Sequence, residues 1–126
     1  MENTGKQQGK SSPKFFREEN FFDRVYELVG QIPFGMVSTY GSIAKALGAA
    51  SSSRMVGYAL TCAAGTDIPC HRVVNRFGAL TGRLHFGNPN LMRQLLEAEG
   101  ITFRPDGTVD MEKHLYDFLK AKKLPR

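Results

Sequence analysis

The chain has 126 residues, 41% of them hydrophobic and 23% charged, which are ordinary proportions for a globular domain. This length suits one domain with a modest core, and no apolar stretch is long enough to span a bilayer or to form a secretory signal. Because two cysteines are too few for a disulfide framework, we expect free thiols and a cytoplasmic location.

The net charge of +5 is concentrated in the middle of the chain. Between Leu28 and Leu96, Asp67 is the one acidic residue beside one lysine and five arginines, whereas acidic side chains gather near 18–27 and 106–117. A basic middle favours one face that binds a polyanion, although arginines scattered over a solvated surface would give the same balance.

Residues 1–14 are rich in glycine, serine and lysine without an apolar period, and we predict a disordered leader there. The domain then spans 15–119, and 120–126 form a basic tail. Apolar residues recur at helical spacing from Asn20, which predicts a first helix that ends before the turn at Pro33.

Two shorter helices are predicted next. Thr39 is the expected N-cap of a helix over Tyr40–Leu47, which Gly48 stops. Ser51–Ser53 offer caps for a third helix, with Gly65 as its candidate C-cap. Two helices joined by a short turn are typical of a helix-turn-helix.

Extended segments follow the third helix. The pair Arg72–Asn75 and Ala79–Phe86, around Phe77-Gly78, predicts a hairpin. We therefore expect a winged helix-turn-helix that is mainly α with a small β wing.

The rest of the domain contains one long helical pattern and short elements. Asn88-Pro89 begins a fourth helix that ends at Gly100. A small hairpin around 105–107 and a short helix over His114–Leu119 complete the domain.

Cys70 and His71 stand side by side in the apolar run Ile68–Val74. A thiolate is a strong, soft nucleophile, and a neighbouring imidazole can take the thiol proton. A cysteine in an apolar run is otherwise a common buried hydrophobe. The pair is a candidate nucleophile and base, provided that the chain turns at Pro69-Cys70 or that a water bridges the two side chains.

Glu99 is another candidate catalytic group. It shares a face of the fourth predicted helix with Met92, Leu95 and Leu96, so it should point inward in the last turn, where the helix dipole also disfavours an anion. A carboxylate in such a place needs a cationic or hydrogen-bonding partner, and a backbone group is one alternative.

The heptapeptide Ile68–Val74 resembles the active-site signature of the O6-alkylguanine-DNA alkyltransferases. Thr39-Tyr40-Gly41 and Ser53–Gly57 match this family as well, and the resemblance covers roughly Phe21–Gly100. It implies a DNA repair protein that flips O6-alkylguanine out of the duplex and transfers the alkyl group irreversibly to Cys70, once per molecule.

The resemblance also implies roles for single residues. His71 would activate the cysteine, Glu99 would orient His71, and Tyr40 would assist extrusion and donate a hydrogen bond or proton to the purine. Arg54 would replace the flipped base from a helix in the minor groove, whereas a core tyrosine and a major-groove helix are the alternatives without the resemblance. The implied partner is double-stranded DNA containing alkylated guanine, bound by a monomer without metal or cofactor. The other residues implied are Thr39, Ser53, Gly57, Arg76 and Arg83 for DNA binding, and Pro69 and Arg72 for the structure of the cysteine loop.

The sequence departs from the family in two places. By alignment, Ala63 stands where the family has an asparagine that bonds the cysteine loop, and residues 81–86 replace the tyrosine, serine and glycine expected against the flipped base. These departures resemble the alkyltransferase-like branch, which binds the lesion for nucleotide-excision repair but usually lacks a cysteine at the position of Cys70. Lesion binding therefore follows more directly than alkyl transfer, and a sensor would need nucleotide-excision repair proteins as partners.

Two alternatives from other classes remain at this point. A winged-helix transcription regulator would bind one sequence in intact duplex, but it has no use for a Cys-His pair. Zinc could be held by Cys62, Cys70, His71 and His85, although their spacing matches no familiar ligand pattern.

Overall fold

The computed structural model describes residues 13–123, with side-chain burial for residues 21–121. Helix α1 (Pro13–Gln31) begins inside the predicted leader and well before Asn20, so the predicted start of this helix was too late. Proline suits the first turn of a helix because its missing N–H needs no partner there. The rest of the predicted leader and the end of the predicted tail lie outside the described residues.

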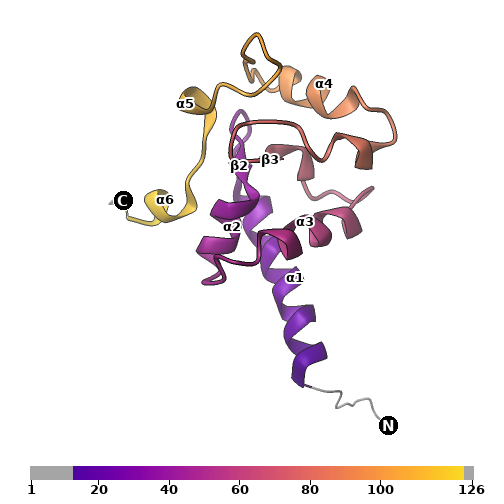
Figure 1. The fold of residues 1–126 in the computed structure, drawn as a ribbon, viewed down its shortest axis with the longest axis vertical. Coiled ribbons are helices and arrows are strands. Elements are labelled where there is room, and N and C mark those ends of the chain that lie inside the picture. The colour runs from indigo at the N-terminus through magenta and orange to yellow at the C-terminus, as the bar shows by residue number, and fades with distance from the viewer. Residues whose placement is uncertain (1–12, 124–126) are drawn as a thin grey trace.

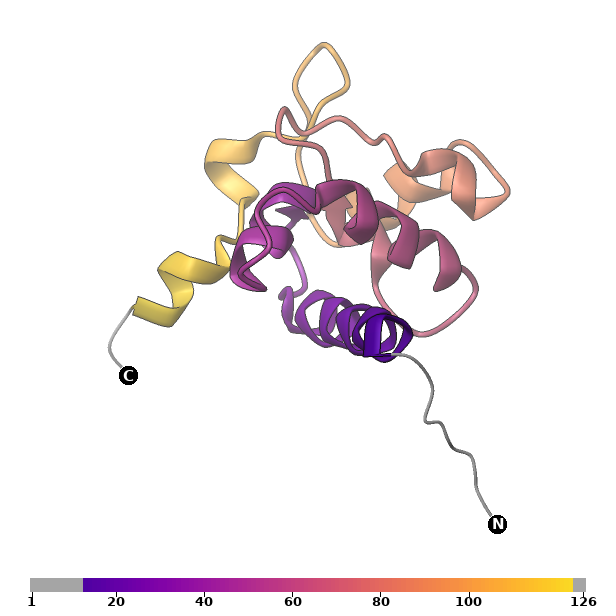
Figure 2. The ribbon, with the colours of Figure 1, turned by 60° about the horizontal axis from the view of Figure 1, so that its bottom comes forward.

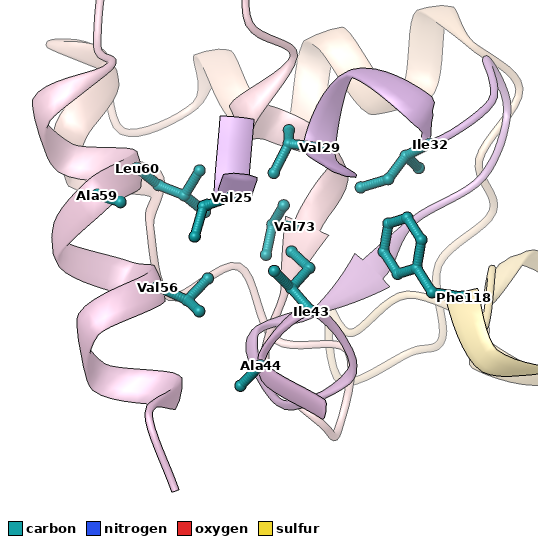
Figure 3. Close-up of a cluster of buried hydrophobic side chains, with 10 residues drawn as sticks. All are labelled: Val25, Val29, Ile32, Ile43, Ala44, Val56, Ala59, Leu60, Val73 and Phe118. Atoms are coloured by element: carbon teal, nitrogen blue, oxygen red, sulfur yellow. The ribbon is translucent and has the colours of Figure 1, made fainter. Parts of the chain in front are cut away.

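Helices α1, α2 (Tyr40–Ala46) and α3 (Ser53–Cys62) pack around the first of two hydrophobic clusters. Helix α2 begins at the predicted cap, because the Thr39 side chain accepts a hydrogen bond from the backbone N–H of Ser42 (2.9 Å). The three helices form the predicted helix-turn-helix body (Figure 1). The buried residues of this cluster are Val25, Val29, Ile32, Ile43, Ala44, Val56, Ala59, Leu60, Val73 and Phe118 (Figure 3).

The predicted C-cap of α3 is wrong. Ala63 is the C-cap residue, and its backbone N–H bonds the carbonyl of Leu60 (3.1 Å). Gly65 lies two residues further along, with φ +84°, and serves the turn that follows the helix.

The sheet consists of two short parallel strands, β2 (Ser38–Thr39) and β3 (Val73–Val74). The predicted pairing of the wing is therefore wrong: β3 pairs with a strand that precedes α2, and residues 79–86 form no strand. The fold is nevertheless a winged helix-turn-helix, mainly helical, with residues 75–86 in the place of the wing. These residues are called the wing segment below.

Side-chain bonds of Asn75 explain why the wing segment is a loop. The Asn75 side-chain oxygen accepts hydrogen bonds from the backbone N–H groups of Phe77 and Ala79 (2.9 and 2.8 Å). Such local bonds compete with a strand ladder. The segment then passes the buried Leu80 and ends in the 3₁₀ turn η2 (Arg83–Phe86).

Helix α4 (Leu91–Ala98) contributes Met92 and Leu96 to the second hydrophobic cluster. It begins later than predicted, because the side chain of Asn88 accepts from the backbone N–H of Asn90 (2.8 Å) in a separate turn. Its predicted end at Gly100 is confirmed by a φ of +87°, which glycine adopts readily. The buried residues of this cluster are Val37, Val74, Leu80, Met92, Leu96, Ile101 and Val109.

A small hairpin follows α4, as predicted. Phe103 and Val109 form an antiparallel bridge across it. The hairpin also holds the wing segment, because the N–H of Val109 donates to the carbonyl of Gly78 (2.9 Å). Gly78 has φ +87°, and a Cβ there would lie 2.7 Å from the carbonyl oxygen of Val109, so this position requires glycine.

The chain ends in two short helices, α5 (Met111–His114) and α6 (Phe118–Lys123), instead of the predicted single helix over His114–Leu119. The residues between them are extended, because the N–H of Tyr116 donates to the carbonyl of Val37 (2.7 Å). Both helices lie on the other side of the molecule from α4 (Figure 2). Within the described residues, no helix is long and apolar enough to cross a membrane.

Candidate active site and nucleic-acid interface

The centre of the apolar heptapeptide folds as a tight turn. The N–H of Cys70 donates to the carbonyl of Ile68 (2.7 Å), and that of Arg72 donates to the carbonyl of Pro69 (3.0 Å). The second bond and that from the N–H of Val73 to the carbonyl of Cys70 form the 3₁₀ turn η1 (Cys70–Arg72), and Pro69 suits its start because the proline ring fixes φ. Since β3 enters the core directly afterwards, the turn holds three consecutive polar side chains at the edge of the core.

Glu99 lies inward at the end of α4 and has three hydrogen-bonding partners. Its carboxylate is 2.8 Å from Nε2 of His71, and it accepts from Nε and Nη2 of Arg72 (3.0 and 2.8 Å). The backbone N–H of Gly35 also donates to it (3.0 Å). Arg72 donates through Nη1 to the carbonyl of Ile32 (2.9 Å), which ties the cysteine turn to the end of α1. The carboxylate thus binds both side chains and a backbone group.

The charge of Glu99 is set by these partners. Burial alone would raise the pKa of Glu99, because desolvation disfavours an anion. Hydrogen bonds from Arg72, Gly35 and His71, with the positive charge of Arg72, outweigh burial and lower the pKa from 4.5 to about 2. A carboxylate that is ionised at neutral pH accepts a hydrogen bond from a protonated Nε2. In the neutral ring of His71, Nδ1 is then the nitrogen without a proton and can accept.

Cys70 is half-buried beside the first hydrophobic cluster. Its thiol donates a weak hydrogen bond to the carbonyl of Leu60, with 3.9 Å between sulfur and oxygen. Burial raises the pKa of Cys70 from 9.0 to about 11. The resting group at neutral pH is therefore a protonated thiol.

A cavity of about 590 Å³ opens beside Cys70. This volume lies within the range of about 300–1,000 Å³ that is usual for small-molecule sites. Its walls are formed by α3, by the cysteine turn and by the wing segment. Of the residues singled out from the sequence, the cavity brings together Tyr40, Gly57, Pro69, Cys70, His71 and Arg72.

Tyr40 stands between this cavity and a second hollow of about 500 Å³. Its hydroxyl accepts a long hydrogen bond from the hydroxyl of Thr81 in the wing segment (3.4 Å). Its ring faces Gly57, where an added Cβ would lie 3.8 Å from the ring. Ser53 and Arg54, at the start of α3, line the hollow with Tyr40 and Gly57, so four residues singled out from the sequence lie together there.

The other residues expected to bind DNA are less closely grouped. The side chain of Thr39 caps α2. Arg76 is exposed, with its guanidinium 4.7 Å from the centroid of the Phe77 ring. Arg83 is exposed as well and donates through Nη1 to the carbonyl of Leu80 (3.2 Å). Neither arginine lines the cavity or the hollow.

Sequence reasoning missed Thr61 and Gly35 as residues of the site. Thr61 lines the cavity from α3, and its hydroxyl lies 3.4 Å from Nε2 of His85, which was considered from the sequence only as a zinc ligand and as part of the loop 81–86. Gly35 was seen only as a turn residue, because no sequence signal connects a turn to a carboxylate far along the chain. Ala63, in place of the expected asparagine, is buried at the cavity wall. In the described part of the chain, no three His, Cys, Asp or Glu side chains are grouped to hold a metal ion.

Comparisons with known proteins agree with this geometry. A DNA base-flipping protein of Escherichia coli is 38% identical over 110 residues, which cover 83% of this chain and 81% of that protein. A methylated-DNA–protein-cysteine methyltransferase of Mycobacterium tuberculosis is 39% identical over 84 residues, 66% of this chain and 50% of that protein. Among solved structures, Schizosaccharomyces pombe Atl1 in complex with damaged DNA containing O6-carboxymethylguanine matches with a TM-score of 0.68 and 33% identity, over 78% of this chain and 95% of that one.

A family model gives the most direct assignment. The model for the 6-O-methylguanine DNA methyltransferase DNA-binding domain matches residues 20–101. This range includes the cysteine turn, the helix that carries Arg54, and Glu99. The chain therefore belongs to the DNA-binding domain family of the 6-O-methylguanine DNA methyltransferases.

Proposed function

We propose that this protein binds duplex DNA containing O6-alkylguanine, takes the modified base into the cavity, and accepts the alkyl group on the sulfur of Cys70. The observation that carries the proposal is the position of Cys70, which lines a cavity directly beside the His71–Glu99 pair. Two relatives, one named a base-flipping protein and one a cysteine methyltransferase, support the same class of function.

Helix α3 is the recognition helix in this proposal. Arg54 lies in its first turn, where a cation opposes the helix dipole and a DNA phosphate would offset that cost. The exposed guanidinium is long enough to occupy the space of an extruded base. Tyr40 and Gly57 line both the hollow beside Arg54 and the cavity beside Cys70, so they mark the route of the base from the groove to the thiol.

The proposed transfer balances atoms and charge. The sulfur of Cys70 forms a bond to the alkyl carbon while the bond between that carbon and O6 breaks, and the electron pair of the broken bond goes to the guanine. The thiol proton is taken up by Nδ1 of His71, since Nε2 faces Glu99, and the guanine gains one proton in return. Tyr40 lines the cavity, and in this proposal its hydroxyl donates to the leaving purine. The thioether on Cys70 has no easy reverse path, so each molecule acts once.

A lesion sensor without transfer is the second candidate, and the state of Cys70 favours it. Burial raises the pKa of this thiol to about 11, so little thiolate exists at neutral pH. Its hydrogen bond is to the carbonyl of Leu60 and not to His71. A sensor would flip the same base, leave the sulfur unchanged and present the lesion to nucleotide-excision repair proteins.

Mass spectrometry after incubation with an O6-methylguanine duplex separates the two candidates. Transfer should add one methyl group to the peptide that contains Cys70, and Cys70→Ser should abolish the adduct. Cys62→Ser is the matched control, because Cys62 is an exposed thiol outside the cavity lining, and it should leave the adduct intact. An unmodified Cys70 after long incubation with excess duplex would contradict transfer.

Binding assays test the part that both candidates share. The protein should bind the O6-methylguanine duplex more tightly than the same duplex with guanine, and Cys70→Ser should retain this preference. Equal affinity for damaged and intact DNA would reject both candidates. Tight binding to one intact sequence, regardless of alkylation, would instead identify a transcription regulator.

A further inference from the structure

His114 is a buried histidine with hydrogen bonds at both ring nitrogens, and it lies beyond residues 20–101. The backbone N–H of Thr102 donates to its Nε2 (3.0 Å), and the hydroxyl of Thr102 lies 2.9 Å from the same nitrogen. Its Nδ1 is 3.3 Å from the carbonyl oxygen of Gly35. The ring therefore spans the distance between the C-terminal hairpin and the turn that follows α1.

The partners of His114 fix its tautomer. A backbone N–H can only donate, so Nε2 is the acceptor and carries no proton. The proton of the neutral ring is then on Nδ1, which donates to the carbonyl of Gly35. His114 thus holds Gly35 by a directed hydrogen bond and is itself held by Thr102.

Gly35 connects this histidine to the candidate active site. Its N–H donates to the carboxylate of Glu99 (3.0 Å), while its carbonyl accepts from His114 (3.3 Å). Glycine has wide conformational freedom, and Gly35 has φ +85°, so bonds on both sides of its Cα are needed to fix its two peptide groups. The turn also packs against the end of α4, since a Cβ on Gly35 would lie 3.4 Å from the carbonyl oxygen of Glu99.

We infer that His114 is a positioning residue for the active site: through Gly35 it holds the Glu99 carboxylate, and thereby His71, in place beside Cys70. The inference rests on the proposed role of the His71–Glu99 pair in activating Cys70. It extends the hydrogen-bonded chain of His71, Glu99 and Gly35 into the C-terminal segment.

Three variants distinguish this role from a purely structural one, because any loss at His114 leaves buried polar groups unpaired and lowers stability. His114→Asn places an amide nitrogen near the position of Nδ1, which preserves the bond to Gly35 and loses the bond to Thr102. His114→Gln places an amide oxygen near the position of Nε2, which preserves Thr102 and loses Gly35. Val109→Ala weakens the same segment from a fully buried position without touching Gly35.

The test measures the rate at which iodoacetamide alkylates Cys70 in the full chain carrying Cys62→Ser, at a temperature where all variants are folded. We expect His114→Gln to slow alkylation about tenfold, a modest part of what general-base assistance typically supplies. His114→Asn and Val109→Ala should both react at close to the parent rate. By NMR, the amide proton of Gly35 should exchange faster and shift upfield in His114→Gln alone, since only there is its bond to Glu99 loosened.

Two results would overturn the inference. Equal alkylation rates in His114→Gln and His114→Asn would show that the bond to Gly35 does not matter. Slowing by Val109→Ala to the extent seen with His114→Gln would show that general weakening of the segment is the cause. Iodoacetamide alkylation needs no DNA, so the two proposals can fail separately. The expected alkylation rates without methyl transfer would contradict only the proposed transfer. Methyl transfer without these alkylation rates would contradict only the role of His114.

Discussion

The two sides of the cavity differ in how firmly they are held. On the inner side, the cysteine turn and Glu99 are joined by hydrogen bonds of 2.8 to 3.1 Å. On the outer side, the wing segment reaches across the cavity through two bonds of 3.4 Å, from Thr81 to Tyr40 and between His85 and Thr61. The groups proposed for chemistry are therefore held by short hydrogen bonds before any DNA binds, whereas the rim proposed to admit a base is held by longer ones.

Arg72→Ala should have the largest effect on stability, because it removes the hydrogen bonds of Arg72 to Glu99 on the inner side. Glu99, with 7% of its side chain exposed, would lose its cation. Removing one partner of a buried ion pair is strongly destabilising, so we expect the free energy of unfolding to fall by about 3 kcal/mol in urea denaturation.

Arg104→Ala is the matched control for that loss. Its ion pair with Asp110 spans 3.7 Å, and the two side chains are 50% and 33% exposed, so its removal should change stability by less than about 1 kcal/mol. Similar losses in the two variants would contradict a preorganised inner side.

Low pH should have the second largest effect on stability, because it protonates Glu99 on the inner side. Because the pKa of Glu99 is lowered from 4.5 to about 2, its charged form stabilises the fold above pH 4.5, and this contribution is lost as the pH falls towards 2. The loss should be on the order of 2 kcal/mol. Glu99→Gln has no carboxylate at this place, so its stability should vary less across the same window. Urea denaturation at each pH measures this. A free energy of unfolding that falls equally with pH in both proteins would contradict the lowered pKa of Glu99.

Arg54→Ala tests the outer side of the cavity, where we expect an effect on DNA binding and not on stability. Its side chain is exposed, so stability should change by less than about 0.5 kcal/mol. Affinity for the O6-methylguanine duplex should nevertheless fall about tenfold, which is about 1.4 kcal/mol, and more than affinity for the intact duplex. Fluorescence anisotropy with both duplexes measures this, and Arg104→Ala again serves as the control. Equal losses for damaged and intact DNA would remove the special role of Arg54.

The smallest effects are expected in the wing segment. Arg76→Ala and Arg83→Ala should each weaken binding to damaged and intact duplex by the same factor, as expected for contacts to phosphates. Each should also lower the slope of log affinity against log salt concentration by about 1. An unchanged slope would place the wing segment away from the DNA backbone.

The features that the sequence predicted well depend on near neighbours. Thr39 caps a helix three residues before Ser42, and Gly100 directly follows Glu99, the C-cap residue of α4. The inward direction of Glu99 follows from its spacing along one helix. Caps and helical faces are local effects, so a single sequence is enough to find them.

The features that it missed depend on distant partners. A strand of two residues carries no readable period, so Val73–Val74 could not be assigned to Ser38–Thr39 in advance. The extended residues before α6 follow a strand partner at Val37, far upstream. The bond from His114 to Gly35 joins positions 79 residues apart in the chain, and no local propensity encodes it.

The C-terminal segment contributes to both hydrophobic cores, so its removal should affect the whole fold. A fragment that stops at residue 101 would retain every side chain expected to react or to touch DNA, yet Val109 and Phe118 would be missing from the two cores. Gly78, in the wing segment, would lose its hydrogen bond with the N–H of Val109. The segment that completes the two cores therefore extends beyond residues 20–101, the range that the family model matches. Cleavage within the hairpin should destabilise the fold without removing Cys70.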